Sequence, residues 1–257
     1  QYDVTLAVDD GGNVNGNPLN DTGRFVVNVD DVNDVTEPHF GGATYNLETS
    51  GGATIKLYGT NFGPTDFKYL LTGKNASVVV KYGPRGGDTT KYTAKNCFVS
   101  KRNTEISCMT VPGVGKDLAF TVFVDGSSSP ASSVGLSFIP PAITKVEFEP
   151  STISTKGGDN VTITGTNFGP LGTLVELVSY QNNVGDTILA TNCRVIVAFV
   201  KVKCSTGPGT GKDLTFKIKF GGQESSSFAS NLTYTKPGIT SMTVPSETGG
   251  NSSTDFS

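Results

Sequence analysis

The feature that most constrains the fold is an internal repeat. The segment GGATIKLYGTNFGP at 51–64 returns as GGDNVTITGTNFGP at 157–170, and GVGKDLAF at 113–120 returns as GTGKDLTF at 209–216. A unit of about 100 residues that occurs twice predicts two tandem domains of one fold, at 38–140 and 141–236. The blocks recur at unequal offsets, so the second copy is shorter between them, and the missing residues belong to a loop.

Both copies show the alternation that is typical of strands with one solvated face. Val161 and Ile163 alternate with polar neighbours, and 214–220 places an apolar residue at every second position. The chain contains 32 Gly and 13 Pro in 257 residues, a content that suits many turns between short strands. The pattern therefore predicts an all-β protein with two β-sandwiches in a row.

Composition excludes several classes of function. The formal net charge is −3 and no Lys/Arg run exceeds two residues, so no surface for nucleic acid or anionic membrane is expected. No apolar stretch is long enough to span a bilayer. The chain has one histidine, His39, no tryptophan and four cysteines, which is too little for a nucleophile–base pair or a zinc site. We therefore expect no enzyme.

The repeated residues carry a family resemblance. A Gly-Gly pair before a strand, Gly-Thr-Asn-Phe-Gly-Pro, a Cys pair and Gly-x-Gly-Lys-Asp-Leu resemble the IPT/TIG domain over about 38–236. The resemblance implies tandem immunoglobulin-like β-sandwiches in which Phe62 and Phe168 close one end of each core. It implies no single function, because IPT domains occur in cell-surface receptors, secreted matrix proteins, modules of starch-acting enzymes and Rel-type transcription factors.

Residues 1–37 resemble the last strands of a cadherin-like repeat. In cadherins the matching residues bind Ca²⁺ between domains, and oxygen ligands suit that ion. The residues that match these ligands are Asp9 (or Asp10), Asp31, Asn33 and Asp34. The sequence departs from the family where Val35 replaces the usual Asn and two extra residues precede Pro38. A solvated acidic linker is therefore the alternative to calcium, the one cofactor that the resemblance implies.

The two ends of the sequence resemble parts of domains. The Gln-Tyr-Asp-Val start is not a signal peptide, so we expect a removed signal or an internal piece of a longer chain. Residues 237–257 resemble the opening of a further IPT-like unit, with Pro-Gly-Ile-Thr aligned to Pro-Ala-Ile-Thr at 141–144. Covalent continuation into further domains and completion by neighbouring molecules are both compatible with these ends.

The cysteines form two pairs of equal spacing, Cys97/Cys108 and Cys193/Cys204. Each pair is predicted to lie on neighbouring strands of one hairpin. An even count that is duplicated with the domain favours one disulfide in each copy, worth about 3 kcal/mol in the chain-entropy model. Disulfides imply an oxidising compartment, and hence an extracellular or cell-surface protein.

Five Asn-x-Ser/Thr sequons fit the same location. The candidate glycosylation sites are Asn20, Asn75, Asn160, Asn231 and Asn251. Asn160 and Asn231 each precede an inward-facing residue, so their side chains are expected to point to solvent. In a eukaryotic source these two are the predicted glycan sites.

The turn between the paired cysteines differs between the copies. The first copy has a soluble turn, Lys-Arg-Asn-Thr-Glu at 101–105, and the second has Val-Ala-Phe-Val-Lys at 197–201. Turns normally take polar residues. Either the strands of the second copy are longer and bury these side chains, or Ile196, Val197 and Phe199 contact a neighbouring domain or subunit.

These features favour a segment of a large extracellular modular protein with a structural or adhesive role, including fibre formation. Its expected partners are other copies of itself or neighbouring domains of the same chain. The alternatives are a ligand-binding receptor ectodomain and a carbohydrate-binding accessory module of a secreted hydrolase. The absence of tryptophan disfavours the last of these, because sugar platforms need exposed rings.

Overall fold

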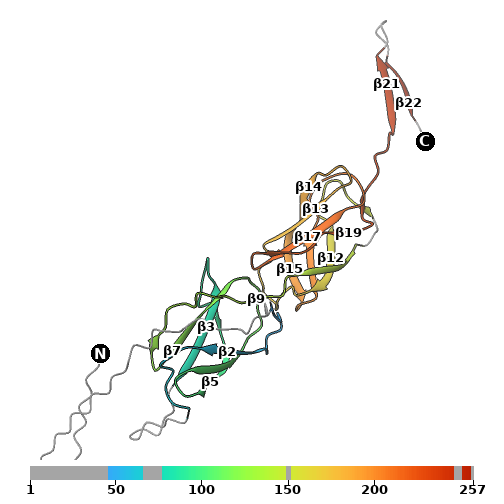
Figure 1. Ribbon diagram of the computed structural model, residues 1–257. Coiled ribbons are helices and arrows are strands. Elements are labelled where there is room, and N and C mark those ends of the chain that lie inside the picture. The colour runs from blue at the N-terminus through green and yellow to red at the C-terminus, as the bar shows by residue number, and fades with distance from the viewer. Residues whose placement is uncertain (1–45, 66–76, 149–151, 246–250, 256–257) are drawn as a thin grey trace, which may run out of the picture. The chain divides into compact units, whose positions relative to one another are not determined.

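Every regular element in the described residues is a β-strand (Figure 1). The computed structural model describes residues 46–65, 77–148, 152–245 and 251–255. The chain divides between Ile139 and Pro140 into two units, unit 1 and unit 2. The cadherin-like segment 1–37 lies outside the described residues.

Unit 1 contains two antiparallel sheets and a short parallel pair of strands. The first sheet has the order β2 (Thr54–Tyr58), β6 (Glu105–Met109), β5 (Lys95–Lys101). The second sheet has the order β4 (Tyr92–Thr93), β3 (Val78–Pro84), β7 (Leu118–Val124), β8 (Ser127–Ser128). The parallel pair is β1 (Asn46–Leu47) with β9 (Ser137–Phe138).

Unit 2 repeats this plan with one more strand in each of the two sheets. The first sheet has the order β10 (Ala142–Glu147), β12 (Asn160–Thr166), β16 (Lys201–Ser205), β15 (Thr191–Val197). The second has the order β14 (Thr187–Leu189), β13 (Leu177–Gln181), β17 (Thr215–Phe220), β18 (Gln223–Glu224), and β19 (Phe228–Ala229) also pairs with β17. The parallel pair is β11 (Thr152–Ile153) with β20 (Thr233–Tyr234), and β21 (Ser241–Pro245) forms a separate hairpin with β22 (Asn251–Asp255).

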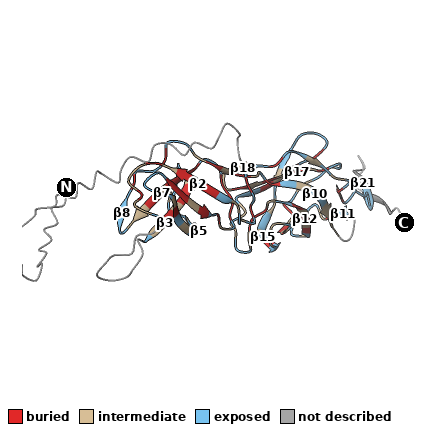
Figure 2. Ribbon diagram, turned by 60° about the horizontal axis from the view of Figure 1, so that its bottom comes forward, coloured by how far each residue is buried: buried red, intermediate tan, exposed pale blue. Residues whose placement is uncertain are grey.

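The predicted alternation places the core of each unit. In β12, Val161 and Ile163 are fully buried between exposed or half-buried neighbours, and β17 alternates in the same way along its length. Figure 2 shows that buried residues lie along the strands of both units. In unit 1 the rings of Tyr82 and Phe120 stack with centroids 5.0 Å apart. The all-β, immunoglobulin-like sandwich fold predicted from the sequence is confirmed.

The duplicated Gly-Thr-Asn-Phe-Gly-Pro segment closes one end of each core. Phe62 and Phe168 are both fully buried, as expected. Asn167 and Gly169 on either side of Phe168 have φ values of 63° and 77°, a left-handed backbone that Asn and Gly adopt most easily. The segment therefore recurs because its backbone turns an aromatic side chain into the core.

Candidate contact surface

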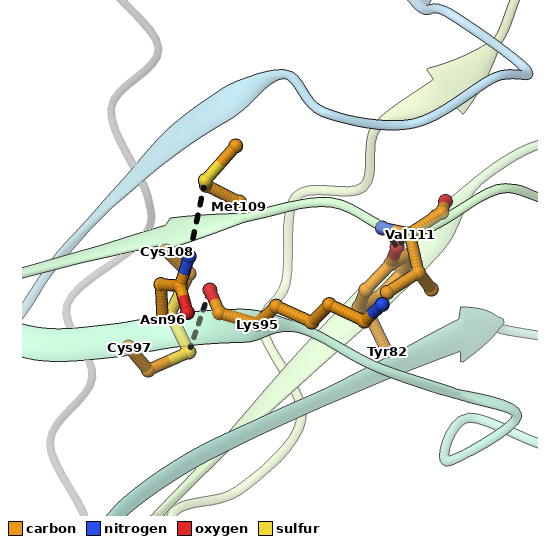
Figure 3. Close-up of a disulfide and its surroundings, with 7 residues drawn as sticks. All are labelled: Tyr82, Lys95, Asn96, Cys97, Cys108, Met109 and Val111. Carbon is orange, nitrogen blue, oxygen red and sulfur yellow. Dashed lines mark hydrogen bonds between the residues drawn. A yellow bond between two sulfur atoms is a disulfide. The ribbon is translucent and has the colours of Figure 1, made fainter.

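One disulfide is present in each unit, as predicted. Cys97 is bonded to Cys108, with Cα atoms 4.2 Å apart (Figure 3). Cys193 is bonded to Cys204, with Cα atoms 4.1 Å apart. The register of both hairpins shifts next to the first cysteine, at Asn96 and its counterpart in unit 2, where φ is 52°. These bulges explain the repeated Asn-Cys pair, because asparagine tolerates the left-handed backbone that the bulge requires.

The hairpin that carries each disulfide ends in a turn of the same length in both units. In unit 1, β5 ends at Lys101 and β6 begins at Glu105; in unit 2, β15 ends at Val197 and β16 begins at Lys201. The interpretation that longer strands displace the turn of unit 2 is therefore wrong. Its apolar residues lie at the tip itself.

These apolar side chains are exposed to solvent. Ile196 is 38% exposed, Val197 46% and Val200 39%, and Phe199 is half-buried. We call these four residues the apolar tip. An exposed apolar cluster at a position that normally takes polar residues is typical of a contact surface.

Phe199 occupies the tip at a cost in backbone energy. Its φ is 67°, a left-handed conformation that is rare for a bulky residue, whereas its counterpart Asn103 has φ 62° and a side chain suited to it. The backbone N–H of Phe199 donates to the carbonyl of Gly169 over 2.7 Å, and its own carbonyl accepts from Phe168. Asn103 makes the matching pair of bonds in unit 1. The fold thus imposes the conformation, and unit 2 places a phenylalanine there despite the strain.

The corresponding tip of unit 1 is held by an ion-pair cluster. Glu105, expected in a soluble turn, is buried, and its carboxylate accepts from the Ser100 hydroxyl at 2.8 Å. The ammonium groups of Lys56 and Lys101 each lie 3.2 Å from a Glu105 oxygen. The Ser100 hydrogen bond, followed by the two lysines, lowers the pKa of Glu105 from 4.5 to about 2. Sequence reasoning missed this cluster because its partners come from two strands far apart in the chain.

Of the remaining predicted site residues, the structure describes some and not others. Asn160 and Asn231 are exposed, as the alternation predicted. Asn20 and Asn75 lie outside the described residues, and for Asn251 only the backbone of β22 is described. The proposed calcium ligands also lie outside: Asp9, Asp31, Asn33 and Asp34. Within the described ranges, no group of three or more His, Cys, Asp or Glu side chains could hold a metal ion.

A groove of about 400 Å³ lies beside one of these sequons. Phe148 and Phe228, both half-buried, line it together with Asn231. The only sequence signal for this groove is the position of Phe228, three residues before Asn231. No helix in the part of the chain that the structure describes is long and apolar enough to cross a membrane.

Three comparisons with known proteins show what this chain is similar to. No curated protein matches the chain. Among solved structures, the plexin A4 extracellular region (domains 1 to 10) is 21% identical over 66% of this chain, with TM-score 0.25. SGBP-B from a xyloglucan utilization locus of Bacteroides uniformis is 16% identical over 79%, with TM-score 0.29. InvD from Yersinia pseudotuberculosis is 14% identical over 80%, with TM-score 0.27.

This chain spans only part of each of those structures, 14%, 54% and 63% of their respective lengths. The family model described as "IPT/TIG domain" matches residues 141–236, which are the predicted bounds of the second copy. Unit 2 therefore contains an IPT/TIG domain at 141–236.

Proposed function

We propose that this chain is a segment of an extracellular modular protein in which disulfide-bonded sandwiches have a structural or adhesive role and no catalytic one. Both units carry an internal disulfide, which is typical of oxidising compartments. Two sequons present exposed asparagines, Asn160 and Asn231. The cadherin-like resemblance of 1–37, with its calcium ligands, fits the same setting.

The observation that carries the proposal is the apolar tip of unit 2. In unit 1 the same turn is stabilised by ion pairs between a buried carboxylate and two lysines. In unit 2 the turn exposes Ile196, Val197 and Val200 and holds Phe199 in a strained backbone conformation. The partner that we propose is a second copy of the chain. A two-fold contact pairs the tip with itself and needs no other apolar surface. With a net charge of −3, two copies repel each other only weakly.

The size of the tip sets the strength of this contact. Burying one fully exposed side chain of this size contributes about 2 kcal/mol, and Phe199, which is already half-buried, contributes less. Four side chains cover much less than the ~800 Å² per partner of a stable interface. We therefore expect weak association of one chain, which becomes substantial only when several copies are linked in an array or fibre.

Sedimentation velocity over a concentration series tests this function. The variant Val197→Lys/Phe199→Asn introduces the residues that unit 1 has at the same backbone positions, so the fold is retained and self-association is lost. Val184→Asn is the control, because Val184 is 73% exposed in the turn between β13 and β14 and is outside the tip. Equal association of the wild type and the tip variant would contradict the proposal. Specific binding on a glycan array would instead favour the carbohydrate-binding alternative.

A further inference from the structure

The groove beside Asn231 combines apolar walls with an attachment point. β10 supplies one wall through Val146, continued by Phe148, and Phe228 of β19 supplies the other. Both rings are half-buried, so part of each face is open to the groove. A volume of about 400 Å³ falls within the range of small-molecule sites, roughly 300–1,000 Å³.

The backbone on both sides of Asn231 is fixed. The N–H of Ser230 donates to the Leu214 carbonyl at 3.0 Å, and the Ser230 hydroxyl donates to the same oxygen at 2.6 Å. On the other side, the Leu232 carbonyl accepts from the N–H of Leu214 at 3.3 Å. Asn231 is exposed between these anchored residues. A group attached to its side chain would therefore start from a defined position at the edge of the groove.

Unit 1 lacks both the acceptor and the ring. At the aligned positions it has Gly135 for Asn231 and Ser132 for Phe228. There the Arg85 guanidinium donates to the carbonyls of Ser132 and Ser133 at 2.8 and 2.9 Å. The sequon and the half-buried ring thus occur together in one copy and are absent together from the other, where a side chain of the protein binds the same segment.

We propose that the groove is the docking site for the first sugar of an N-linked glycan on Asn231, an N-acetylglucosamine whose apolar ring face packs on Phe228. A sugar ring presents C–H groups on one face, and this face matches an exposed aromatic ring. The covalent link keeps the sugar at high effective concentration beside the groove. The inference rests on the proposed extracellular function, because the modification requires passage through a secretory pathway.

The second exposed sequon of the same domain provides a matched control. Asn160 begins β12 and is followed by Val161-Thr162, so it is also an Asn-x-Thr acceptor. Three residues before it stands Gly157, where Asn231 has Phe228. A glycan on Asn160 has no aromatic residue at that spacing to pack on.

The test uses the whole 257-residue chain, secreted from eukaryotic cells and trimmed with an endoglycosidase that leaves one N-acetylglucosamine per site. Glycopeptide mass spectrometry measures the occupancy of Asn231, and calorimetry measures the Tm of unit 2. We compare Asn231→Gln and Asn160→Gln in the wild-type and Phe228→Ser backgrounds. Comparing the change in Tm that each glycan causes in the two backgrounds subtracts any direct effect of losing Phe228 on the Tm.

We expect the sugar on Asn231 to raise the Tm by about 3–6 °C, and the sugar on Asn160 to change it by less than about 1 °C. In the Phe228→Ser background, the rise in Tm caused by the sugar on Asn231 should disappear. Ring-current shifts of the sugar protons in NMR spectra should disappear with it. An unoccupied Asn231, or an increment that persists without Phe228, would overturn the inference. Neither result would affect the proposed structural role, which depends on the apolar tip and not on glycans.

Discussion

The buried tyrosines of unit 2 offer a test of how two nearly identical hydroxyls differ in their contribution to stability. Tyr180 of β13 and Tyr234 of β20 have hydroxyl oxygens 2.8 Å apart, and both are buried. The buried N–H of Gly207 donates to the Tyr180 hydroxyl at 3.0 Å, and the Tyr234 hydroxyl donates to the Gly207 carbonyl at 2.8 Å. Removing the Tyr180 hydroxyl takes away the acceptor of the Gly207 N–H, whereas removing the Tyr234 hydroxyl takes away one of two donors near the Gly207 carbonyl.

The two phenylalanine variants should therefore differ. Tyr180→Phe removes the acceptor of a buried N–H, which costs about 2 kcal/mol. Tyr234→Phe is milder, at about 0.5–1 kcal/mol, because the Tyr180 hydroxyl remains 3.3 Å from the Gly207 carbonyl and can donate to it. Unit 1 already has the arrangement that Tyr234→Phe would create in unit 2. Phe138 is aligned to Tyr234, and a single hydroxyl, that of Tyr82, bonds to the backbone N–H and carbonyl of Val111.

Thermal unfolding of unit 2, followed by calorimetry, checks the difference. For a domain of about 100 residues, 1 kcal/mol corresponds to about 4–8 °C in Tm. We expect Tyr180→Phe to lower the Tm by about 10 °C and Tyr234→Phe by about 5 °C or less. Equal losses, or a larger loss for Tyr234→Phe, would refute the reasoning that the unpaired Gly207 N–H dominates the cost.

Other predictions concern pH and the disulfides. Because the pKa of Glu105 is lowered to about 2 in the folded state, unit 1 should lose stability as the pH falls from about 4.5 to 2. When the Tm is measured over this pH range, Glu105→Gln should make it less dependent on pH. Burial raises the pKa of Tyr82 to about 12, so its hydroxyl ionises at lower pH in the unfolded state than in the folded state. Unit 1 should therefore lose stability between about pH 10 and 12, and Tyr82→Phe should remove this loss. Cys193→Ala/Cys204→Ala should lower the free energy of unfolding of unit 2 by about 3 kcal/mol in urea titrations, and the variant's unit 2 should then be insensitive to reductant.

The fold and the disulfides could be predicted from the sequence because the signals for them are local and duplicated. Alternation over a few residues identifies strands such as β12 and β17. The spacing of Cys193 and Cys204 indicates a hairpin because neighbouring antiparallel strands bring such positions together. The bulge at Asn96 was not predicted, although the repeated Asn-Cys pair was its signal. Asparagine before a bulge cysteine could have suggested a left-handed residue there.

The candidate contact surface could be only half predicted. The sequence shows that 197–201 is apolar where 101–105 is polar, but either a shifted turn or an exposed tip explains that difference. Only the register of β15 against β16 decides between them. Glu105 was expected in solvent because acidic residues in turns normally are, and its burial depends on Lys56 from a distant strand. The groove at Asn231 depends on β10 lying beside β19, which no local pattern predicts.

At the hairpin tip the two units differ in their side chains but share one backbone conformation. The positive φ at Asn103 and Phe199 and the paired backbone bonds to the Gly-Thr-Asn-Phe-Gly-Pro loop are the same in both. Asparagine would therefore suit unit 2 at least as well as phenylalanine, and stability alone does not explain Phe199. The same reasoning applies to Phe228 and Asn231, which stand where unit 1 has Ser132 and Gly135. Residues that the shared fold does not require, and that unit 2 alone carries at its surface, are the positions where we expect its function to differ from that of unit 1.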